Sequence, residues 1–355
     1  MYEPITIKDI AKALGLSTST VSRALRGSYE ISPETKKLVI EYAEQYNYRP
    51  NPIALSLKER RSRSIGVVVC EIANNFFSQA INGIESIAYN RGYHVIISQS
   101  HESYDREVVN VEHLASRSVD GLLVSLSSET EHIEHFKNLH EKGFPIVFFD
   151  RITEEIETFK VVVDNYKGAY DATQHLVDSG YTKIAHVTSS QHLSISKERL
   201  DGYKAALADN GISLNESYIR YCNHGGMIYA ELEDAVKSLV QLKDRPDAIF
   251  SAGDRLTISC LNALRSIGLK IPDDIALVGF SNSPLAELLN PALSVVKQPA
   301  FEMGQVATEL LIKLIESKRP VTEFEKVVLQ TEIFTRESSA GKVTEKKSKT
   351  KKAVS

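Results

Sequence analysis

The chain has 355 residues, of which 42% are hydrophobic and 25% charged, so we expect a sizeable core divided into two or three folding units. No apolar run approaches the ~18 residues of a membrane helix, and no secretory signal is visible. The three cysteines are widely spaced and offer neither a disulfide framework nor a CxxC site. Residues 1–63 hold 11 Lys and Arg against 7 Asp and Glu, whereas the remainder holds 31 against 39. We therefore expect a cytoplasmic protein without membrane association whose basic N-terminal part meets a polyanion.

The first fifty residues show the pattern of three short helices. Apolar residues recur at helical spacing over residues 7–14, with Thr6 placed as the N-cap. Gly15 interrupts this pattern, Ser17 is a good N-cap for a second helix, and a Ser-Pro pair opens a third. Two short helices joined by a tight glycine-containing turn form a helix-turn-helix, so we predict an all-α helix-turn-helix domain over residues 1–50.

The second of these helices carries Thr18, Ser19, Ser22 and Arg23 on its outward face. An arginine can donate to guanine O6 and N7 with both arms, and hydroxyl groups bond phosphates or base edges. This face is therefore typical of a helix that enters the major groove of DNA. The alternative is a three-helix packing module whose exposed face is merely polar.

A short apolar segment connects this domain to the rest of the chain. Asn51 and Pro52 are placed to cap and open a helix of about two turns, and a basic run follows it up to residue 63. A helix this short is marginal alone in water and needs a partner. We predict a hinge helix and basic linker over residues 51–63, which can insert a leucine into a minor groove. The alternative is a plain interdomain linker.

Three motifs together make the chain similar to the LacI/GalR family of bacterial transcriptional regulators. They are TIKDIA over residues 6–11, STVSRAL over residues 19–25 and YRPN over residues 48–51. Their order, spacing and residue types all agree with the family pattern. The resemblance continues to about residue 336 and so covers nearly the whole chain.

This resemblance implies a homodimer whose recognition helices read the two half-sites of a pseudo-palindromic, double-stranded operator. It implies that Thr18, Ser19 and Arg23 read bases, that Leu57 is a minor-groove wedge, and that Lys58 lies beside it on the DNA. The candidate DNA-contacting residues are Thr6, Ser17, Thr18, Ser19, Thr20, Ser22, Arg23, Asn51, Leu57 and Lys58.

From residue 64 onward, apolar strands alternate with helical patterns. The predicted strands are 65–70, 94–98, 121–126, 146–150, 161–164, 183–187, 248–252 and 275–280. Such alternation predicts an α/β fold with parallel sheets covered on both faces. About 270 residues are too many for one sheet, so we expect a two-lobed, periplasmic-binding-protein-like core over residues 64–336. We place the N-lobe at about 64–161 and 293–322, and the C-lobe at about 162–292 and 323–336.

Ligands of open α/β sheets bind outside the carboxyl ends of the strands, so the residues that follow each strand are candidates. They include carboxylates, arginines, hydroxyls and aromatic rings, a mixture that suits a polyhydroxylated small molecule. The candidate effector-binding residues are Phe76, Phe77, Ser125, Asp150, Arg151, Asn165, Lys197, Arg199, His224 and Asp254.

The family resemblance supports part of this set. It implies that Asp150, Arg199 and Asp254 contact the effector, while for each the alternative is a helix cap or an ion pair between the lobes. Phe76 and Phe77 resemble the aromatic residues that close the family's pocket. Two departures put the identity of the effector in doubt: Asn75 replaces a usual proline, and Ser281-Asn282 stands where the family often has acidic residues.

We therefore predict a DNA-binding transcriptional regulator, with repression as the expected outcome, whose operator affinity is controlled by a sugar-like effector between the lobes. One alternative is a periplasmic-type sugar-binding protein, and another is a sugar-modifying enzyme. No catalytic constellation, GxGxxG or P-loop string supports an enzyme or a cofactor. His132 and His135 are expected on an exposed amphipathic helix rather than at a metal. Residues 337–355 are predicted to be a disordered basic tail without leucine heptads, which favours a dimer.

Overall fold

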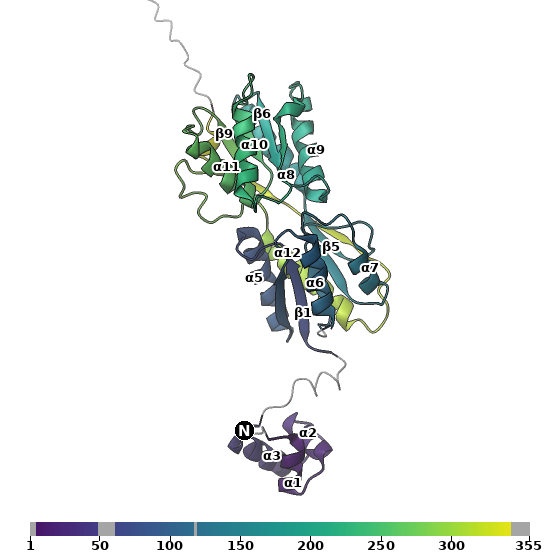
Figure 1. The fold of residues 1–355 in the computed structure, drawn as a ribbon. Coiled ribbons are helices and arrows are strands. Elements are labelled where there is room, and N and C mark those ends of the chain that lie inside the picture. Colours follow the sequence, from purple (N-terminus) through teal and green to yellow (C-terminus); the bar gives the residue numbers. More distant parts are fainter. Residues whose placement is uncertain (1–4, 49–60, 117–118, 342–355) are drawn as a thin grey trace, which may run out of the picture. The chain divides into compact units, whose positions relative to one another are not determined.

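The structure, a computed structural model, describes residues 5–48, 61–116 and 119–341. The chain divides into two compact units, and the boundary falls between Ser62 and Arg63 (Figure 1). No helix within the described residues is long and apolar enough to cross a membrane.

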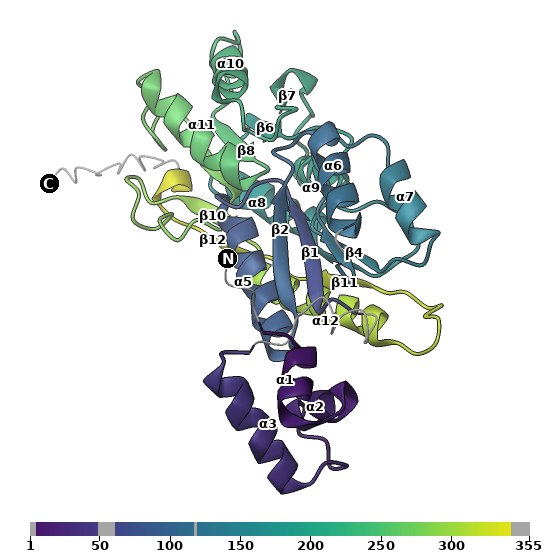
Figure 2. The same ribbon diagram turned by 60° about the horizontal axis from the view of Figure 1, so that its bottom comes forward.

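The first unit is the predicted bundle of three helices, α1 (Ile7–Leu14), α2 (Thr18–Leu25) and α3 (Pro33–Gln45) (Figure 2). Thr6 and Asp9 form the predicted capping box, in which the Thr6 amide donates to Asp9 Oδ2 at 2.9 Å. Apolar side chains from all three helices form one small core, in which Ile10, Val21 and Val39 are completely buried. The helix-turn-helix prediction is confirmed for these residues.

The second unit holds two six-stranded sheets, each the centre of one lobe. The N-lobe sheet has the order β11-β5-β4-β3-β1-β2 and is parallel throughout. The C-lobe sheet has the order β12-β10-β9-β8-β6-β7, and only its edge strand β12 is antiparallel. The strands are β1 (Ser64–Val69), β2 (His94–Gln99), β3 (Leu122–Val124), β4 (Ile146–Phe149), β5 (Lys160–Val163), β6 (Ile184–Thr188), β7 (Ile219–Tyr221), β8 (Ala248–Ser251), β9 (Ala276–Phe280), β10 (Ser294–Lys297), β11 (Lys326–Leu329) and β12 (Glu332–Phe334).

Helices cover both faces of each sheet, as the alternation in the sequence predicts (Figures 1 and 2). In the N-lobe they are α5 (Asn75–Asn90), α6 (Tyr104–Ser116), α7 (Glu134–His140) and α12 (Ala300–Glu316). In the C-lobe they are α8 (Asn165–Asp178), α9 (Ser194–Asp209), α10 (Tyr229–Val240) and α11 (Asp254–Ser266), with short 3₁₀ turns at Glu216–Tyr218 and Glu337–Ser339.

Glycine allows α5 and α12 to pack with their backbones in contact. A Cβ atom on Gly83 would lie 2.0 Å from the carbonyl oxygen of Phe301, and one on Gly304 would lie 2.0 Å from that of Ala80. This contact joins α5, near the beginning of the N-lobe sequence, to a helix more than two hundred residues later. With it, α12 completes the core formed by β1, β4, β5 and α5.

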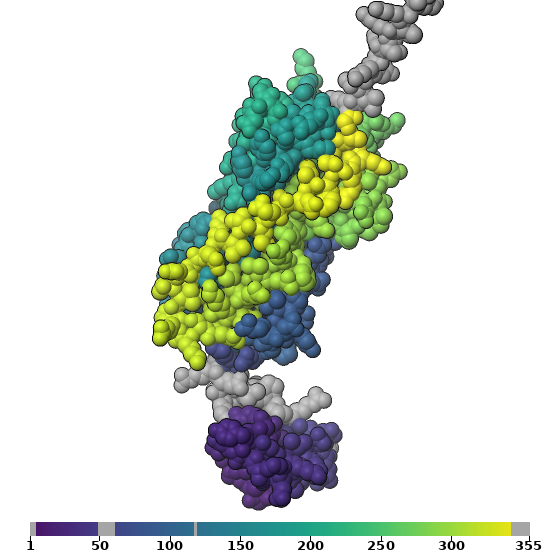
Figure 3. Space-filling model, turned by 180° about the vertical axis from the view of Figure 1, so that it is seen from behind, coloured from purple at the N-terminus to yellow at the C-terminus, as the bar shows by residue number. Residues whose placement is uncertain are grey.

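The eight predicted strands are all present, but the expected lobe boundaries need correction at three places. β5 runs to Val163 in the N-lobe sheet, so residues 162–163 belong to the N-lobe and not to the C-lobe segment 162–292. β10 pairs with β9, so residues 294–297 belong to the C-lobe and not to the N-lobe segment 293–322. β11 pairs with β5, so residues 326–329 belong to the N-lobe and not to the C-lobe segment 323–336. The chain therefore crosses between the lobes after β5, after β10 and after β11, and the part with β11 and β12 runs across both lobes (Figure 3).

The predicted start of the disordered tail also needs correction. Ser338 and Ser339 are completely buried, and Ser338 Oγ donates to the carbonyl oxygen of Leu277 at 2.6 Å. Ser339 Oγ lies 2.6 Å from Ser294 Oγ and 2.7 Å from His175 Nε2. These bonds fasten residues 337–340 to the C-lobe, and the rest of the predicted tail, from residue 342, lies outside the described residues.

Candidate functional site

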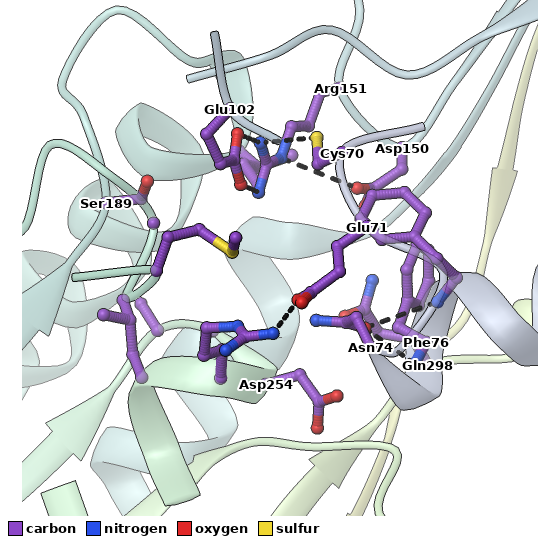
Figure 4. A pocket seen from close by; sticks show the side chains of 18 of the residues that line it. Cys70, Glu71, Asn74, Phe76, Glu102, Asp150, Arg151, Ser189, Asp254 and Gln298 are labelled. Atoms are coloured by element: carbon purple, nitrogen blue, oxygen red, sulfur yellow. Dashed lines mark hydrogen bonds and ion pairs between the residues drawn. The ribbon is translucent and has the colours of Figure 1, made fainter. Parts of the chain in front are cut away.

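A cavity of about 590 Å³, counting its solvent-open part, lies between the lobes at the carboxyl ends of their strands (Figure 4). Six of the ten candidate effector residues line it: Phe76, Phe77, Asp150, Arg151, Arg199 and Asp254. Side chains that the sequence reasoning missed complete the wall, among them Cys70, Glu71, Glu102, Ser189, Met227, Arg255 and Gln298.

Arg151 is held on the N-lobe side of this cavity by Glu102. Its Nη1 donates to Glu102 Oε2 at 2.7 Å and its Nη2 to Glu102 Oε1 at 3.0 Å, a two-armed ion pair. Arg151 Nη1 also lies 3.1 Å from Cys70 Sγ. Although burial raises the pKa of Glu102, the charge and hydrogen bonds of Arg151 outweigh it and lower this pKa below its usual value. Arg151 is therefore already engaged by a carboxylate of the protein.

Asp150, directly after β4, has a φ of +59°, a conformation that is uncommon for a residue other than glycine. Burial raises the pKa of this carboxyl, and the charges of Arg151 and Arg199 oppose that shift. Backbone strain at such a position is typical of functional sites in proteins. The structure thus orients Asp150 in the cavity at a conformational cost.

Arg199 reaches the cavity from α9 and has no ion pair with a carboxylate within the described residues. Its Nε donates to Asn165 Oδ1 at 2.9 Å and its Nη1 to the carbonyl oxygen of Ala252 at 2.8 Å, and its guanidinium stacks on Phe280 at 3.8 Å. Burial lowers its pKa to about 10, so the group stays charged at neutral pH. Arg199 is a buried cation held in place by neutral acceptors and an aromatic ring.

Asp254 is the first residue of α11, and its carboxylate accepts hydrogen bonds from the loop that follows β9. Ser281 Oγ donates to Asp254 Oδ1 at 2.6 Å and the Asn282 amide donates to it at 3.0 Å. Burial raises the pKa of Asp254, whereas the hydrogen bonds from Ser281 and Asn282 act to lower it. The neighbouring Arg255 forms an ion pair with Glu71 of the N-lobe.

The remaining four candidates do not line the cavity. Asn165 is buried behind it and orients Arg199, while Ser125 is buried in the N-lobe. Lys197 is exposed on the outer side of α9. His224 lies 3.2 Å from Glu231, although Gly225 and Met227 next to it in sequence do line the cavity. The strand-end rule could have found Glu71, two residues after β1, and Glu102, three residues after β2, but no sequence signal marks Met227.

The expectation that His132 and His135 share an exposed helix is wrong, although His132 itself is exposed. α7 begins at Glu134, so His132 lies outside the helix. His135 is buried, and its Nε2 lies 3.2 Å from Oε1 of the completely buried Glu107. Glu107 Oε2 also accepts from the amide of Ser127 at 2.7 Å. The pair therefore fixes the loop after β3 from inside the N-lobe.

In the first unit, α2 presents Thr18, Ser19 and Arg23 as exposed side chains. Ser17 caps the helix by accepting from the Thr20 amide at 3.1 Å, and Arg23 forms an exposed ion pair with Glu30 at 3.2 Å. Thr6 caps α1 in the same way as Ser17 caps α2. Ser22 is half-buried, and the candidates Asn51, Leu57 and Lys58 lie outside the described residues.

A helix-turn-helix unit followed by two α/β lobes around a polar cavity defines a DNA-binding protein with a ligand-binding core. Comparison with known proteins agrees. The family model "Bacterial regulatory proteins, lacI family" matches residues 6–51, and the model "Periplasmic binding protein-like domain" matches residues 173–339.

Three similar proteins extend this result over most of the chain. Catabolite control protein A of Priestia megaterium is 32% identical over 315 residues, which cover 88% of this chain and 93% of that protein. The HTH-type transcriptional repressor PurR of Vibrio campbellii is 33% identical over 336 residues, which cover 93% and 97%. A solved structure of the transcriptional regulator CelR–cellobiose complex has a TM-score of 0.70 and 29% identity, and covers 94% of this chain and 99% of that one. The chain belongs to the LacI family of bacterial regulatory proteins, and it is a DNA-binding transcriptional regulator with an effector-binding core.

Proposed function

We propose that this regulator represses transcription as a homodimer on a pseudo-palindromic operator, and that an uncharged sugar or sugar derivative is its effector. The observation that carries the proposal is the chemistry around Arg199. Its partners are neutral oxygens, Asp150 faces the same cavity, and Ser189 Oγ there has no hydrogen-bond partner within the described residues. Sugar hydroxyls both donate and accept, so they match a site that offers a carboxylate, a guanidinium and a free hydroxyl.

The balance of charge in the cavity favours a neutral ligand over an anionic one. Arg151 is paired with Glu102 and Arg255 with Glu71, which leaves Arg199 as the remaining cation of the wall beside two carboxylates, Asp150 and Asp254. The rings of Phe76 and Phe77 supply the apolar surface that covers the C–H faces of a sugar. The cellobiose complex of CelR, a protein of similar fold, supports this class of ligand.

For the DNA side, we propose that the exposed Thr18, Ser19 and Arg23 of α2 contact base edges, and that Thr6, Ser17, Thr20 and Ser22 contact phosphates or support the helix that does. The roles of Asn51, Leu57 and Lys58 as hinge cap, minor-groove wedge and its neighbour remain predictions about residues outside the described ones. An effector then acts through its different affinity for the operator-bound and free states.

The test combines a ligand screen with an operator assay. A thermal-shift screen of the full chain against a sugar library identifies binders, because a ligand of the folded state raises the melting temperature. The hit is then added to a gel-shift assay with genomic fragments. We expect it to change operator affinity in the wild type and not in Arg199→Ala. Retention of no specific DNA fragment would instead favour a sugar-binding protein without a regulatory role.

A further inference from the structure

The loop of residues 26–32, which joins α2 to α3, is folded back onto the end of α2 by hydrogen bonds of Ser28. The Ser28 amide donates to the carbonyl oxygen of Arg23 at 3.1 Å, and the Ser28 carbonyl oxygen accepts from the Ile31 amide at 3.3 Å. Ser28 Oγ accepts from the Glu30 amide at 3.4 Å. Because Ile31 also packs against the core of the three helices, both ends of this short loop are fixed.

The loop places the carboxylate of Glu30 beside the outward face of α2. Glu30 Oε2 lies 3.2 Å from Arg23 Nη1, and about half of each side chain is exposed. α2 itself contains no Asp or Glu, and within residues 5–48 no other carboxylate forms an ion pair with it. Arg26, just after the helix, is held differently, because its Nε donates to the carbonyl oxygen of Ser22 at 3.1 Å. Glu30 therefore acts on one side chain of this helix, that of Arg23.

The geometry of the pair leaves part of the guanidinium available for a base. A guanidinium carries five N–H donors in one plane, and the edge of a guanine uses two of them. The carboxylate of Glu30 faces Nη1, so the other nitrogens of Arg23 can still donate to a base edge. An arginine without a partner samples many rotamers and loses that freedom on binding. Glu30 reduces this entropic cost for Arg23.

The negative charge of Glu30 also weakens binding that depends on charge alone. Non-specific DNA binding comes from the attraction between cations of a protein and the phosphates, and a carboxylate on the DNA-contacting face opposes it. Paired with Glu30, Arg23 is a weaker contact for phosphates, whereas its hydrogen bonds to guanine O6 and N7 depend on geometry and are retained. Both effects favour specific over non-specific binding.

We propose that Glu30 is a specificity-determining residue of the DNA-reading surface, which positions Arg23 toward a base edge and reduces its attraction to phosphates. The proposal rests on the proposed function in one respect, the assignment of Arg23 as a base reader. It adds to that surface a residue that lies outside α2 and makes its contribution through another side chain.

The test is selection of binding sites from a random-sequence DNA duplex pool by the full-length protein, followed by sequencing, which gives the base preference at each position. We expect Arg23→Ala to lose the preference at one base pair. Glu30→Gln keeps the size of the side chain and the bond of its amide to Ser28. It should weaken the preference at that same base pair about two- to fivefold, the range of an exposed ion pair, and leave the other positions unchanged. Its affinity for a duplex without the selected site should be equal to or higher than that of the wild type.

Two controls separate this role from a general effect of charge. Glu44→Gln makes the same change of net charge at an exposed carboxylate that has no ion pair within the described residues, and it should leave every preference unchanged. Glu30→Gln in an Arg23→Ala background should have no further effect on base preference, because the side chain that Glu30 positions is gone. Circular dichroism should give the wild-type melting curve for Glu30→Gln, since the side chain is exposed.

The possible failures are distinguishable. An equal loss of preference at all positions in Glu30→Gln would mean that Glu30 supports the fold of the unit, and it would overturn the proposal. An unchanged preference in Glu30→Gln beside the expected loss in Arg23→Ala would also overturn it, while the proposed function would stand. An unchanged preference in Arg23→Ala would contradict the base-reading role itself, and with it any positioning of that residue by Glu30.

Discussion

The buried His186 makes the stability of the core depend on pH in a way that one substitution can isolate. Its ring stacks on Tyr203 with centroids 5.0 Å apart and lies 5.0 Å from the ring of Phe250. Neither ring nitrogen has a hydrogen-bond partner within the described residues. Burial, aided by the charges of Arg199 and Lys204, lowers the pKa of His186 from 6.5 to about 3.

The sign of the effect follows from proton binding. Between pH 6.5 and about 3 the unfolded chain carries a proton on this imidazole that the folded chain does not. The stabilisation is therefore complete above pH 6.5 and is lost as the pH falls below it. pH 5 lies roughly 1.5 units below the pKa of the imidazole in the unfolded chain. The free energy of unfolding is therefore lower by about 2 kcal/mol at pH 5 than at neutral pH.

The assay is urea unfolding of the full chain at pH 7 and pH 5, followed by circular dichroism at fixed protein concentration. His186→Phe keeps the ring stack and removes two unpartnered nitrogens, so it should fold normally and lose about 2 kcal/mol less than the wild type on going to pH 5. His175 also has a pKa lowered by burial, but it is present in both proteins and cancels in the comparison. His132→Phe, at an exposed position, is the control. Equal losses in wild type and His186→Phe would refute the reasoning.

Three further predictions concern packing, effector binding and DNA reading. Gly304→Ala places a methyl group 2.0 Å from the Ala80 carbonyl oxygen, so it should destabilise the core by about 1–3 kcal/mol in thermal unfolding, and a wild-type melting temperature would contradict the close packing of α5 and α12. Arg199→Lys loses the bond to Ala252 and should abolish the operator response to a bound effector. Because the effector cavity and the DNA-contacting helix are separate sites, effector-free operator affinity should stay within about twofold of the wild type; a normal response would remove this residue from the site. Arg23→Ala should cost about 1–3 kcal/mol of discrimination at one base pair in competition binding with single-base operator variants, and an unchanged preference would exclude a base contact.

Much of the fold follows from local sequence patterns, and the exceptions have a common physical cause. The eight predicted strands are apolar runs bounded by turn residues, and caps such as Thr6 and Ser17 act within three residues of themselves. The strands that were missed are β7, β10, β11 and β12, and none of them is shorter than the predicted β3, so length alone does not explain the omission. β11 becomes a strand by pairing with β5, which lies more than 160 residues earlier in the chain, and no local pattern encodes such a partner.

In the candidate site, too, some residues could be predicted from local sequence patterns and others depend on the tertiary fold. The strand-end rule found Asp150 and Asp254, because the carboxyl ends of parallel strands meet at one edge. It could not separate Arg199 from Lys197, since residues two apart on a helix point to different faces and only the phase of α9 decides which one reaches the cavity. The pairing of Arg151 with Glu102 joins residues 49 apart and depends on the tertiary fold.

The late position of α12 and β11 in the chain has a consequence for biosynthesis. The N-lobe sheet already has five of its six strands when residue 163 has been made, but β5 has no outer neighbour and the α5 face has no α12 until residues 300–329 follow. At 5–20 residues per second, that interval lasts roughly 10–30 seconds. During this interval the apolar face that α12 later covers stays open to water, which gives a chaperone time to bind it. We therefore expect a chain truncated before α12 to aggregate and not to form an isolated lobe.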